Sequence, residues 1–338
     1  MVCMNPDMHQ HLSLMLRDSL NPLVALLDDP MVREVMINGA DDVWVERAGC
    51  LHKTEHAFSS HEARNAIHIL GTMAQRDVGR HNGPSLLDAA FSGMRVSAVL
   101  SPIATKGHAL CIRKLSGALR SLSDYLPQTP SATSAQEAQN LLSKEFQVGA
   151  EPLDQLTDWV KYRKNILVSG GTSTGKTTFL NALIKVMSCS DRIIAIEDPR
   201  ELTIDLPNYV TFEANQTLGV TVRDLVRQSL RFRPDRIVVG EVRGGEAFDL
   251  IQAMNTGHDG CLGTLHANSA QDALHRLEQL VMQSGVGLAI EAIARHISNC
   301  IDGVVHLTRR NGVRQIEKLI SVEGYGDGHY QTHVLFSH

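Results

Sequence analysis

The sequence contains no closely spaced cysteines and few aromatic residues. Its six cysteines stand singly along 338 residues, with no CxxC pair, and Phe, Trp and Tyr together make up 4%. Isolated cysteines fit neither a zinc ribbon nor a disulfide framework, so we expect reduced thiols in a cytoplasm. Among 16 histidines, the nearest approach to a zinc motif begins at His61, where Asn65 occupies the position of the second histidine of HExxH. We therefore expect no metal site built from protein side chains alone.

Long hydrophobic runs and an excess of basic charge are also absent. No apolar run approaches the about 18 to 20 residues of a membrane span, and Met1–Asp7 lacks the basic segment that begins a signal peptide. Any membrane contact should therefore be peripheral. Lys and Arg number 32 against 37 Asp and Glu, a net charge of −5. This balance argues against a protein dedicated to binding nucleic-acid backbone.

The length of the chain predicts two domains, because 338 residues exceed what one ordinary core accommodates. Residues 1–115 have the pattern of a compact α/β domain. The alternation at Val43–Glu46 predicts a half-buried strand, and Ser60 is expected to cap a helix. Two further strands are expected at 95–100 and 109–113.

Residues 116–150 form a predicted linker region with helical composition over 135–146, and residues 151–338 form a second α/β domain. In this second domain, continuous apolar runs alternate with segments of helical spacing, which predicts a mainly parallel sheet covered on both faces. The expected strands are 165–169, 192–197, 236–240 and 260–265, and the expected helices are 221–231, 245–255 and 269–283. Asn311-Gly312 between two apolar runs predicts a β-hairpin.

The pattern GxxxxGK[ST] of a P-loop lies between an expected strand and an expected helix. Its residues are Gly170, Gly171, Thr172, Ser173, Thr174, Gly175, Lys176 and Thr177, and Thr178 opens the helical stretch. A loop of backbone N–H groups at the start of a helix surrounds polyphosphate. Lys176 would reach the β- and γ-phosphates, and the Thr177 hydroxyl would ligate Mg²⁺. We expect the chain to bind a nucleoside triphosphate with Mg²⁺.

Chemically active residues follow three of the other expected strands. Glu197 and Asp198 end one strand, Glu241 follows a second and His266 a third. Because ligands of open α/β sheets bind at the carboxyl ends of the strands, these side chains should lie beside the phosphates. We interpret Glu241 as the carboxylate that positions and deprotonates the attacking water, with Glu197 as the alternative. His266 can sense the γ-phosphate, although a histidine at this position can equally be structural.

Four sequence blocks in this order resemble the secretion-ATPase superfamily, which powers type II and type IV secretion, type IV pili and conjugation. GGTSTGKTT, IEDPREL, LRFRPDRIVVGEVRGGEAFDLIQAMNTGHDG and GTLHANSA are similar to its Walker A, Asp, Walker B and His boxes. The N-terminal half is similar to the TrbB-type conjugal-transfer branch. The segments MINGADDVWVERAG, GMRVSAVLSP and ALCIRKLS carry that likeness.

The resemblance implies a PAS-like N-terminal domain that closes over ATP bound on a RecA-like domain, in a homohexameric ring. It implies that Arg95 and Arg113 reach the phosphates and that Glu197 and Asp198 lie near the Mg²⁺, partly through water. It also implies a Mg²⁺-dependent ATPase that works with inner-membrane components at the cytoplasmic face, in type IV secretion or conjugative transfer. A pilus-assembly motor would share these residues and a DNA helicase would share the P-loop sheet, so both stay as alternatives.

Overall fold

The computed structural model describes most of the chain outside its N-terminal segment and the predicted linker. The described residues are 18, 20–48, 50–74, 76, 78, 79, 85–91, 93–114, 121–126, 152–215, 218–310 and 312–338. The expected helix at 135–146 lies outside them. The chain divides into two compact units. The first consists of Met1–Ala118 together with Pro199–Glu201 and Thr217–Gly219, and the second consists of the other residues.

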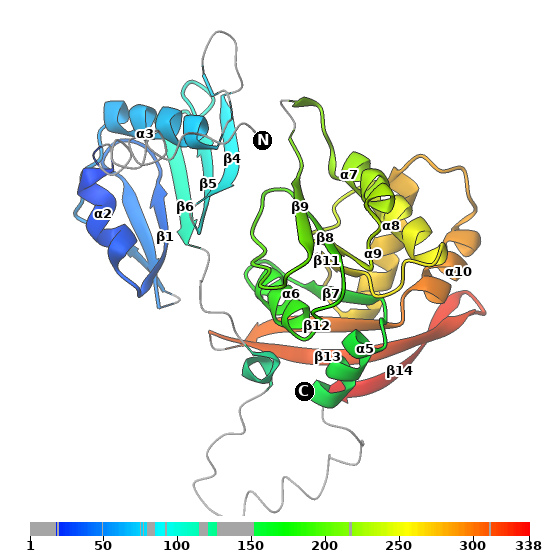
Figure 1. The fold of residues 1–338 in the computed structure, drawn as a ribbon. Coiled ribbons are helices and arrows are strands. Elements are labelled where there is room, and N and C mark those ends of the chain that lie inside the picture. Colours follow the sequence, from blue (N-terminus) through cyan, green and yellow to red (C-terminus); the bar gives the residue numbers. More distant parts are fainter. Residues whose placement is uncertain are drawn as a thin grey trace, which may run out of the picture. The chain divides into compact units, whose positions relative to one another are not determined.

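The first unit is an antiparallel sheet with helices packed on one face (Figure 1). Its strands are β1 (Val32–Ile37), β2 (Val43–Arg47), β3 (Cys50–Lys53), β4 (Leu86–Phe91), β5 (Met94–Val99) and β6 (Ala109–Lys114), in the order β3-β2-β1-β6-β5-β4. Its described helices are α2 (Asn21–Asp28) and α3 (Ser60–Met73). The alternation along β5 and β6 buries Val96 and Ile112 against the helices. Arg95 and Arg113, which alternate with them, therefore lie on the opposite face.

Helix α3 is capped by Ser59, so the expectation of a cap at Ser60 is wrong by one residue. The Ser59 hydroxyl accepts a hydrogen bond from the Glu62 amide at 3.2 Å, and the Glu62 carboxylate accepts one from the Ser59 amide at 2.7 Å. This reciprocal arrangement requires an acid three residues after the cap, and only Ser59 has Glu62 at that spacing.

The second unit is built on a larger, mainly parallel sheet. Its strands are β7 (Ile166–Gly170), β8 (Ile193–Glu197), β9 (Tyr209–Glu213), β10 (Arg236–Val239), β11 (Leu262–Leu265), β12 (Gly303–Arg310), β13 (Val313–Gly326) and β14 (His329–Ser337). Their order is β14-β13-β12-β7-β11-β10-β8-β9. The pairs from β12 to β9 are parallel, whereas β13 and β14 extend the sheet in antiparallel pairs. The expected strands, parallel sheet and hairpin are confirmed, whereas β9, β14 and α10 were not foreseen.

Helices cover both faces of this second sheet. One face packs against α7 (Val222–Ser229), α8 (Glu246–Asn255), α9 (Ala270–Gln283) and α10 (Ile290–Cys300). The other packs against α5 (Pro152–Lys161), α6 (Lys176–Lys185) and the short 3-10 helix Leu122–Tyr125. Successive residues of β7 alternate between the two cores, with Leu167 in the first and Val168 in the second. Burial on both faces explains why these strands are apolar without alternation.

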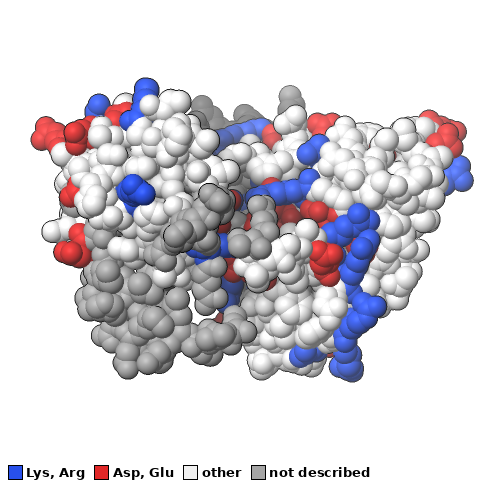
Figure 2. Space-filling model, turned by 90° about the horizontal axis from the view of Figure 1, so that it is seen from above, with Lys and Arg blue, Asp and Glu red and all other residues white. Residues whose placement is uncertain are grey.

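Charges of both signs share the surface. Figure 2 shows basic and acidic side chains next to one another on the face drawn there. Ion pairs such as Arg223 and Arg227 with Asp249, at 2.6 and 2.7 Å, bring the two signs into direct contact. Among the described helices, none has the length and apolar character required to cross a bilayer.

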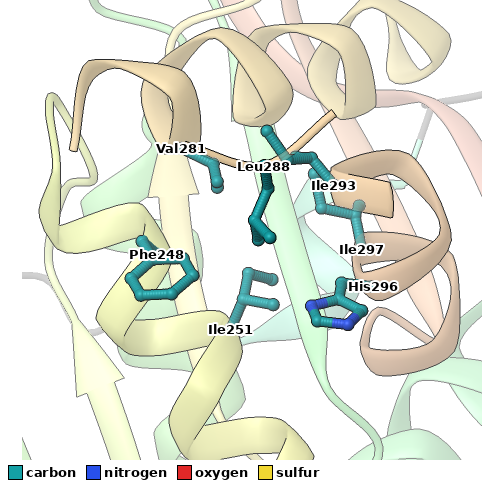
Figure 3. Close-up of a pocket in the computed structure, with 7 residues that line it drawn as sticks. All are labelled: Phe248, Ile251, Val281, Leu288, Ile293, His296 and Ile297. Atoms are coloured by element: carbon teal, nitrogen blue, oxygen red, sulfur yellow. The ribbon is translucent and has the colours of Figure 1, made fainter. Parts of the chain in front are cut away.

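The helices α8, α9 and α10 pack through a small apolar gap (Figure 3). Phe248 and Ile251 come from α8, Val281 from α9, and Leu288 from the connection to α10. The gap is too small to admit a water molecule. It is therefore part of the packing between these helices.

A buried ion pair joins the beginning of β10 to the segment before β8. The Arg236 and Asp191 side chains are only 2% and 3% exposed, and Arg236 Nε donates to Asp191 Oδ2 at 2.6 Å. Arg236 also donates to the Val160 carbonyl at 2.7 Å, and Arg163 donates to the second Asp191 oxygen at 2.6 Å. Removing one partner of such a network leaves a buried charge uncompensated.

Asp191→Ala should lower the free energy of unfolding of the second unit by about 3–5 kcal/mol, since Arg236 would stay buried without its carboxylate. Arg310→Ala, which breaks an exposed pair with Glu317, should change it by at most about 1 kcal/mol. Urea unfolding followed by Trp159 fluorescence in a Trp44→Phe background measures both. If Asp191→Ala lowered the free energy of unfolding as little as Arg310→Ala does, the buried charge of Arg236 would not have the predicted cost.

Candidate functional site

The loop after β7 has a tightly constrained conformation. Space requires glycine at position 170, and the left-handed backbone favours it at position 175. A Cβ at Gly170 (φ +154°) would lie 2.6 Å from the Leu307 carbonyl oxygen, and one at Gly175 (φ +92°) 2.8 Å from Arg314 Cδ. The Thr174 hydroxyl donates to the Gly171 carbonyl at 3.0 Å. A hydrogen bond within the loop thus holds it closed. The backbone of the loop continues directly into the N-terminus of α6.

Lys176 is the first residue of α6, and its ammonium group lies within the loop. Its Nζ donates to the carbonyl oxygens of Gly170 and Gly171 at 3.0 and 2.9 Å, and the residue is 8% exposed. Thr177 and Thr178 follow in the first turn of the same helix. A cation and a hydroxyl at a helix N-terminus are the groups that a P-loop offers to phosphate and Mg²⁺.

Three of the predicted catalytic residues converge beside this loop. Lys176 Nζ lies 3.4 Å from each ring nitrogen of His266, which follows β11. His266 Nε2 lies 3.2 Å from Glu241 Oε1, and Glu241 follows β10. Parallel pairing of β10, β11 and β7 brings their carboxyl ends together, which is the arrangement expected from the sequence.

The charges around Glu241 keep it ionised. Burial by itself would raise the pKa of Glu241, but a hydrogen bond from Arg243 and the positive charges of Arg243 and Lys176 outweigh it, so the pKa lies below its usual value. Arg243 Nη2 donates to Glu241 Oε2 at 2.8 Å. Because the pKa in the folded state is lowered, ionised Glu241 stabilises the fold above its unfolded pKa. That contribution is lost as the pH falls through the folded value.

His266 is kept neutral by the same neighbours. Burial and the charge of Lys176 lower the pKa of His266, more than the Glu241 carboxylate raises it. A neutral ring can accept a hydrogen bond from Lys176 on one nitrogen and donate to Glu241 from the other. His266 therefore links the P-loop lysine to the carboxylate.

Glu197 and Asp198 lie at the end of β8, two strands from β11. Glu197 is 2% exposed, and its Oε1 accepts a hydrogen bond from the Leu202 amide at 2.7 Å. A Cβ at Gly240 would lie 3.0 Å from Glu197 Cγ, so the glycine after β10 leaves room for this side chain. Hydroxyl and carboxylate oxygens from Thr177, Glu197 and Asp198 are donors that suit Mg²⁺. In the described part of the chain, no three His, Cys, Asp or Glu side chains gather as a metal site of their own.

Arg95 and Arg113 are neighbours in the first unit. They pair directly across β5 and β6, on the face of the sheet away from its helices. Asp88 accepts hydrogen bonds from Arg95 at 3.1 and 3.3 Å, and Glu34 accepts from Arg113 at 3.1 to 3.3 Å. Their role toward a nucleotide stays a prediction.

Sequence reasoning missed three features of the site. It did not identify Arg243 as the partner of Glu241, although the two are separated by a single residue. It missed buried His306 on β12, whose Nδ1 lies 2.9 Å from the hydroxyl of Ser169, the residue before the P-loop. It also missed Arg314, which lies against Gly175. The only signal for Arg314 in the sequence is the cluster of arginines around Asn311-Gly312.

The fold and the loop define a P-loop protein of the α/β class. A family model described as "Type II/IV secretion system protein" matches residues 133–327. Conjugal transfer protein TrbB of Rhizobium radiobacter is 33% identical over 96% of this chain and 94% of its own length. Type IV secretion system protein PtlH of Bordetella pertussis is 33% identical over 92% of this chain and 94% of its own. The chain belongs to the type II/IV secretion system protein family, which confirms the resemblance drawn from the sequence.

The fold is also found in a solved structure. The chain is similar to the crystal structure of the pilus retraction motor PilT with bound ADP, with a TM-score of 0.59 and 18% identity. The match covers 96% of this chain and 83% of the PilT chain. At this identity the likeness supports the fold alone.

Arg243→Ala should raise the pKa of Glu241, because burial raises it and the main opposing hydrogen bond and charge would be gone. A carbon-13 NMR titration of the Glu241 carboxyl in selectively labelled protein measures the change. Arg231→Ala is the control, since Arg231 donates instead to the Arg227 carbonyl. An unchanged Glu241 pKa in Arg243→Ala would show that Lys176 and His266 set it without Arg243.

Proposed function

We propose that this protein is a Mg²⁺-dependent ATPase that hydrolyses ATP to ADP and phosphate and drives type IV secretion or conjugative transfer. The observation that carries the proposal is the convergence of Lys176, His266 and Glu241 beside the P-loop. A cradle for polyphosphate next to an ionised carboxylate supplies both the binding and the base that hydrolysis requires.

In the proposed reaction, the loop amides and the N-terminus of α6 hold the phosphates of ATP. Lys176 exchanges its bonds to the Gly170 and Gly171 carbonyls for bonds to the β- and γ-phosphates. Glu241 orients a water molecule in line with the γ-phosphorus and accepts its proton as the P–O bond to ADP breaks. When bound, Mg²⁺ would neutralise phosphate charge, held by Thr177 with Glu197 and Asp198 nearby. The buried environment of Glu197 makes it the less accessible candidate for the base.

His266 has the position of a sensor in this scheme. It contacts both Lys176 and Glu241, so movement of the lysine toward a phosphate would change the hydrogen bond that orients the carboxylate. A neutral imidazole suits the role, because it can exchange donors and acceptors without changing the net charge of the site.

The first unit would complete the site through Arg95 and Arg113. Guanidinium groups are suited to the charge that develops on a transferring phosphoryl group. Both arginines lie on the polar face of their sheet and form ion pairs that an anionic ligand can replace. We propose that nucleotide binding draws this face over the phosphates and that product release lets it part, which gives a cyclic domain motion.

We propose that a homohexameric ring carries out this cycle at the cytoplasmic face of the inner membrane. Its partners would be membrane components of the secretion apparatus. A head-to-tail ring places equivalent sites at successive subunit boundaries. Relatives named for conjugal transfer and type IV secretion match nearly the whole chain at 33% identity. The likeness to the pilus motor PilT extends to the fold alone, so secretion or conjugation is preferred to pilus movement.

Glu241→Gln should bind ATP but hydrolyse it at least about 100-fold more slowly, because an amide cannot accept the proton of the attacking water. Retention of labelled ATP on the full-length protein, followed by single-turnover quenching, separates binding from hydrolysis. Lys176→Ala should lose turnover with weakened phosphate binding. Normal turnover by Glu241→Gln would move the base to Glu197.

Arg113→Gln should lower single-turnover hydrolysis by at least about tenfold, with a smaller change in ATP affinity, because arginine fingers act mainly on the transition state. Arg95→Gln should act in the same direction. Arg47→Gln is the control, since Arg47 lies on β2 of the same sheet and pairs with Asp29. Equal rates for Arg113→Gln, Arg47→Gln and the unmodified protein would assign Arg113 to the fold of its domain.

A further inference from the structure

Arg314, near the beginning of β13, lies directly against the P-loop. A Cβ built on Gly175 would be 2.8 Å from Cδ, 3.3 Å from Nε and 3.5 Å from Nη1 of Arg314. The arginine side chain therefore occupies the space where a side chain of residue 175 would project.

A second arginine, Arg309, lies on the same face of the β12–β13 hairpin as Arg314. Arg309 on β12 is the direct partner of Arg314 across the antiparallel pair, so both side chains lie on the same side of the sheet. Leu307 and Ile316, which belong to that side, pack in the same core as Phe179 of α6. Arg309 and Arg314 thus lie on the face of the sheet that α6 covers. They are at the end of the sheet where β7 leads into the P-loop and the P-loop leads into α6.

The order of the strands fixes which end of a nucleotide would reach these arginines. β7 has β11 on one side and β12 on the other. Lys176 reaches toward His266 and Glu241 on the β11 side, so the γ-phosphate belongs there. A nucleotide extended along the loop then directs its ribose and base toward the β12–β13 side, where Arg314 lies.

We propose that Arg314 is a nucleotide-binding residue that stacks its guanidinium on the base of ATP while its aliphatic stem rests on Gly175. This inference rests on the proposed function, since it requires ATP on the loop. A planar guanidinium stacks on aromatic rings, which an ammonium group of similar charge does less well. Every base has such a face, so the contact adds affinity for nucleosides with little choice among bases.

The test compares a nucleotide with its phosphate chain alone. Isothermal titration calorimetry on the full chain with Mg²⁺ measures the affinity for AMP-PNP and, separately, for tripolyphosphate. Arg314→Met keeps a stem to pack on Gly175 and removes the planar cation. It should weaken AMP-PNP binding by about tenfold and leave tripolyphosphate binding within about twofold. Arg314→Lys, which keeps the charge without the plane, should recover only part of the AMP-PNP affinity.

The matched control is Arg310→Met in the same hairpin, because Arg310 is exposed and pairs with Glu317 at 2.7 Å. It should bind both ligands as the unmodified protein does. Equal weakening of AMP-PNP and tripolyphosphate by Arg314→Met, or full recovery by Arg314→Lys, would overturn the stacking assignment in favour of a phosphate contact. Unchanged AMP-PNP affinity would overturn it outright. Failure of the unmodified protein to bind either ligand would instead contradict the proposed function.

Discussion

The parallel pairing of β7 on both sides is the constraint on which the rest of the site depends. Because β11 and β12 run in the same direction on its two flanks, the loop after β7 emerges between the carboxyl ends of both neighbours. The Leu307 carbonyl on one flank approaches so closely that residue 170 must be glycine. His266 on the other flank lies within 3.4 Å of the lysine that ends the loop. A single strand position thus determines the shape of the cradle and the chemistry next to it.

At this edge of the sheet, burial and nearby charges together set the protonation states of Glu241 and His266. Burial alone would favour a protonated Glu241, and Arg243 with Lys176 reverses that preference. The same lysine, together with burial, keeps His266 neutral. One ionised carboxylate and one neutral imidazole are therefore held side by side.

Arginine serves different purposes in different parts of the molecule. Arg236 is buried with Asp191, so each compensates the charge of the other inside the second unit. Arg243 holds a carboxylate in its ionised state. Arg113 and Arg314 are half-buried, and we propose that each meets the nucleotide as a planar cation. The chemistry of the side chain is the same in each case, and the surroundings decide its role.

The sequence by itself determined the P-loop, its flanking strand and helix, the parallel sheet and the carboxylates at the strand ends. These features are local: the glycines, the lysine and the apolar runs are contiguous in the chain, so spacing alone locates them. The positions at the strand ends suggested the catalytic roles of Glu241, Glu197 and His266, which stay predictions, and the comparisons confirmed the family.

Only the tertiary structure decided which residues touch. Arg314 lies about 140 residues after Gly175 in the sequence, and its contact with the loop exists because β13 pairs with β12 and β12 with β7. Likewise, the glycine at position 240 has its reason in Glu197, a residue on the neighbouring strand. Edge strands such as β9 and β14 escaped prediction because they are partly exposed and lack the continuous apolar runs of the centre. Strand order and side-chain contact arise from packing over the whole sheet, and no short stretch of sequence contains that information.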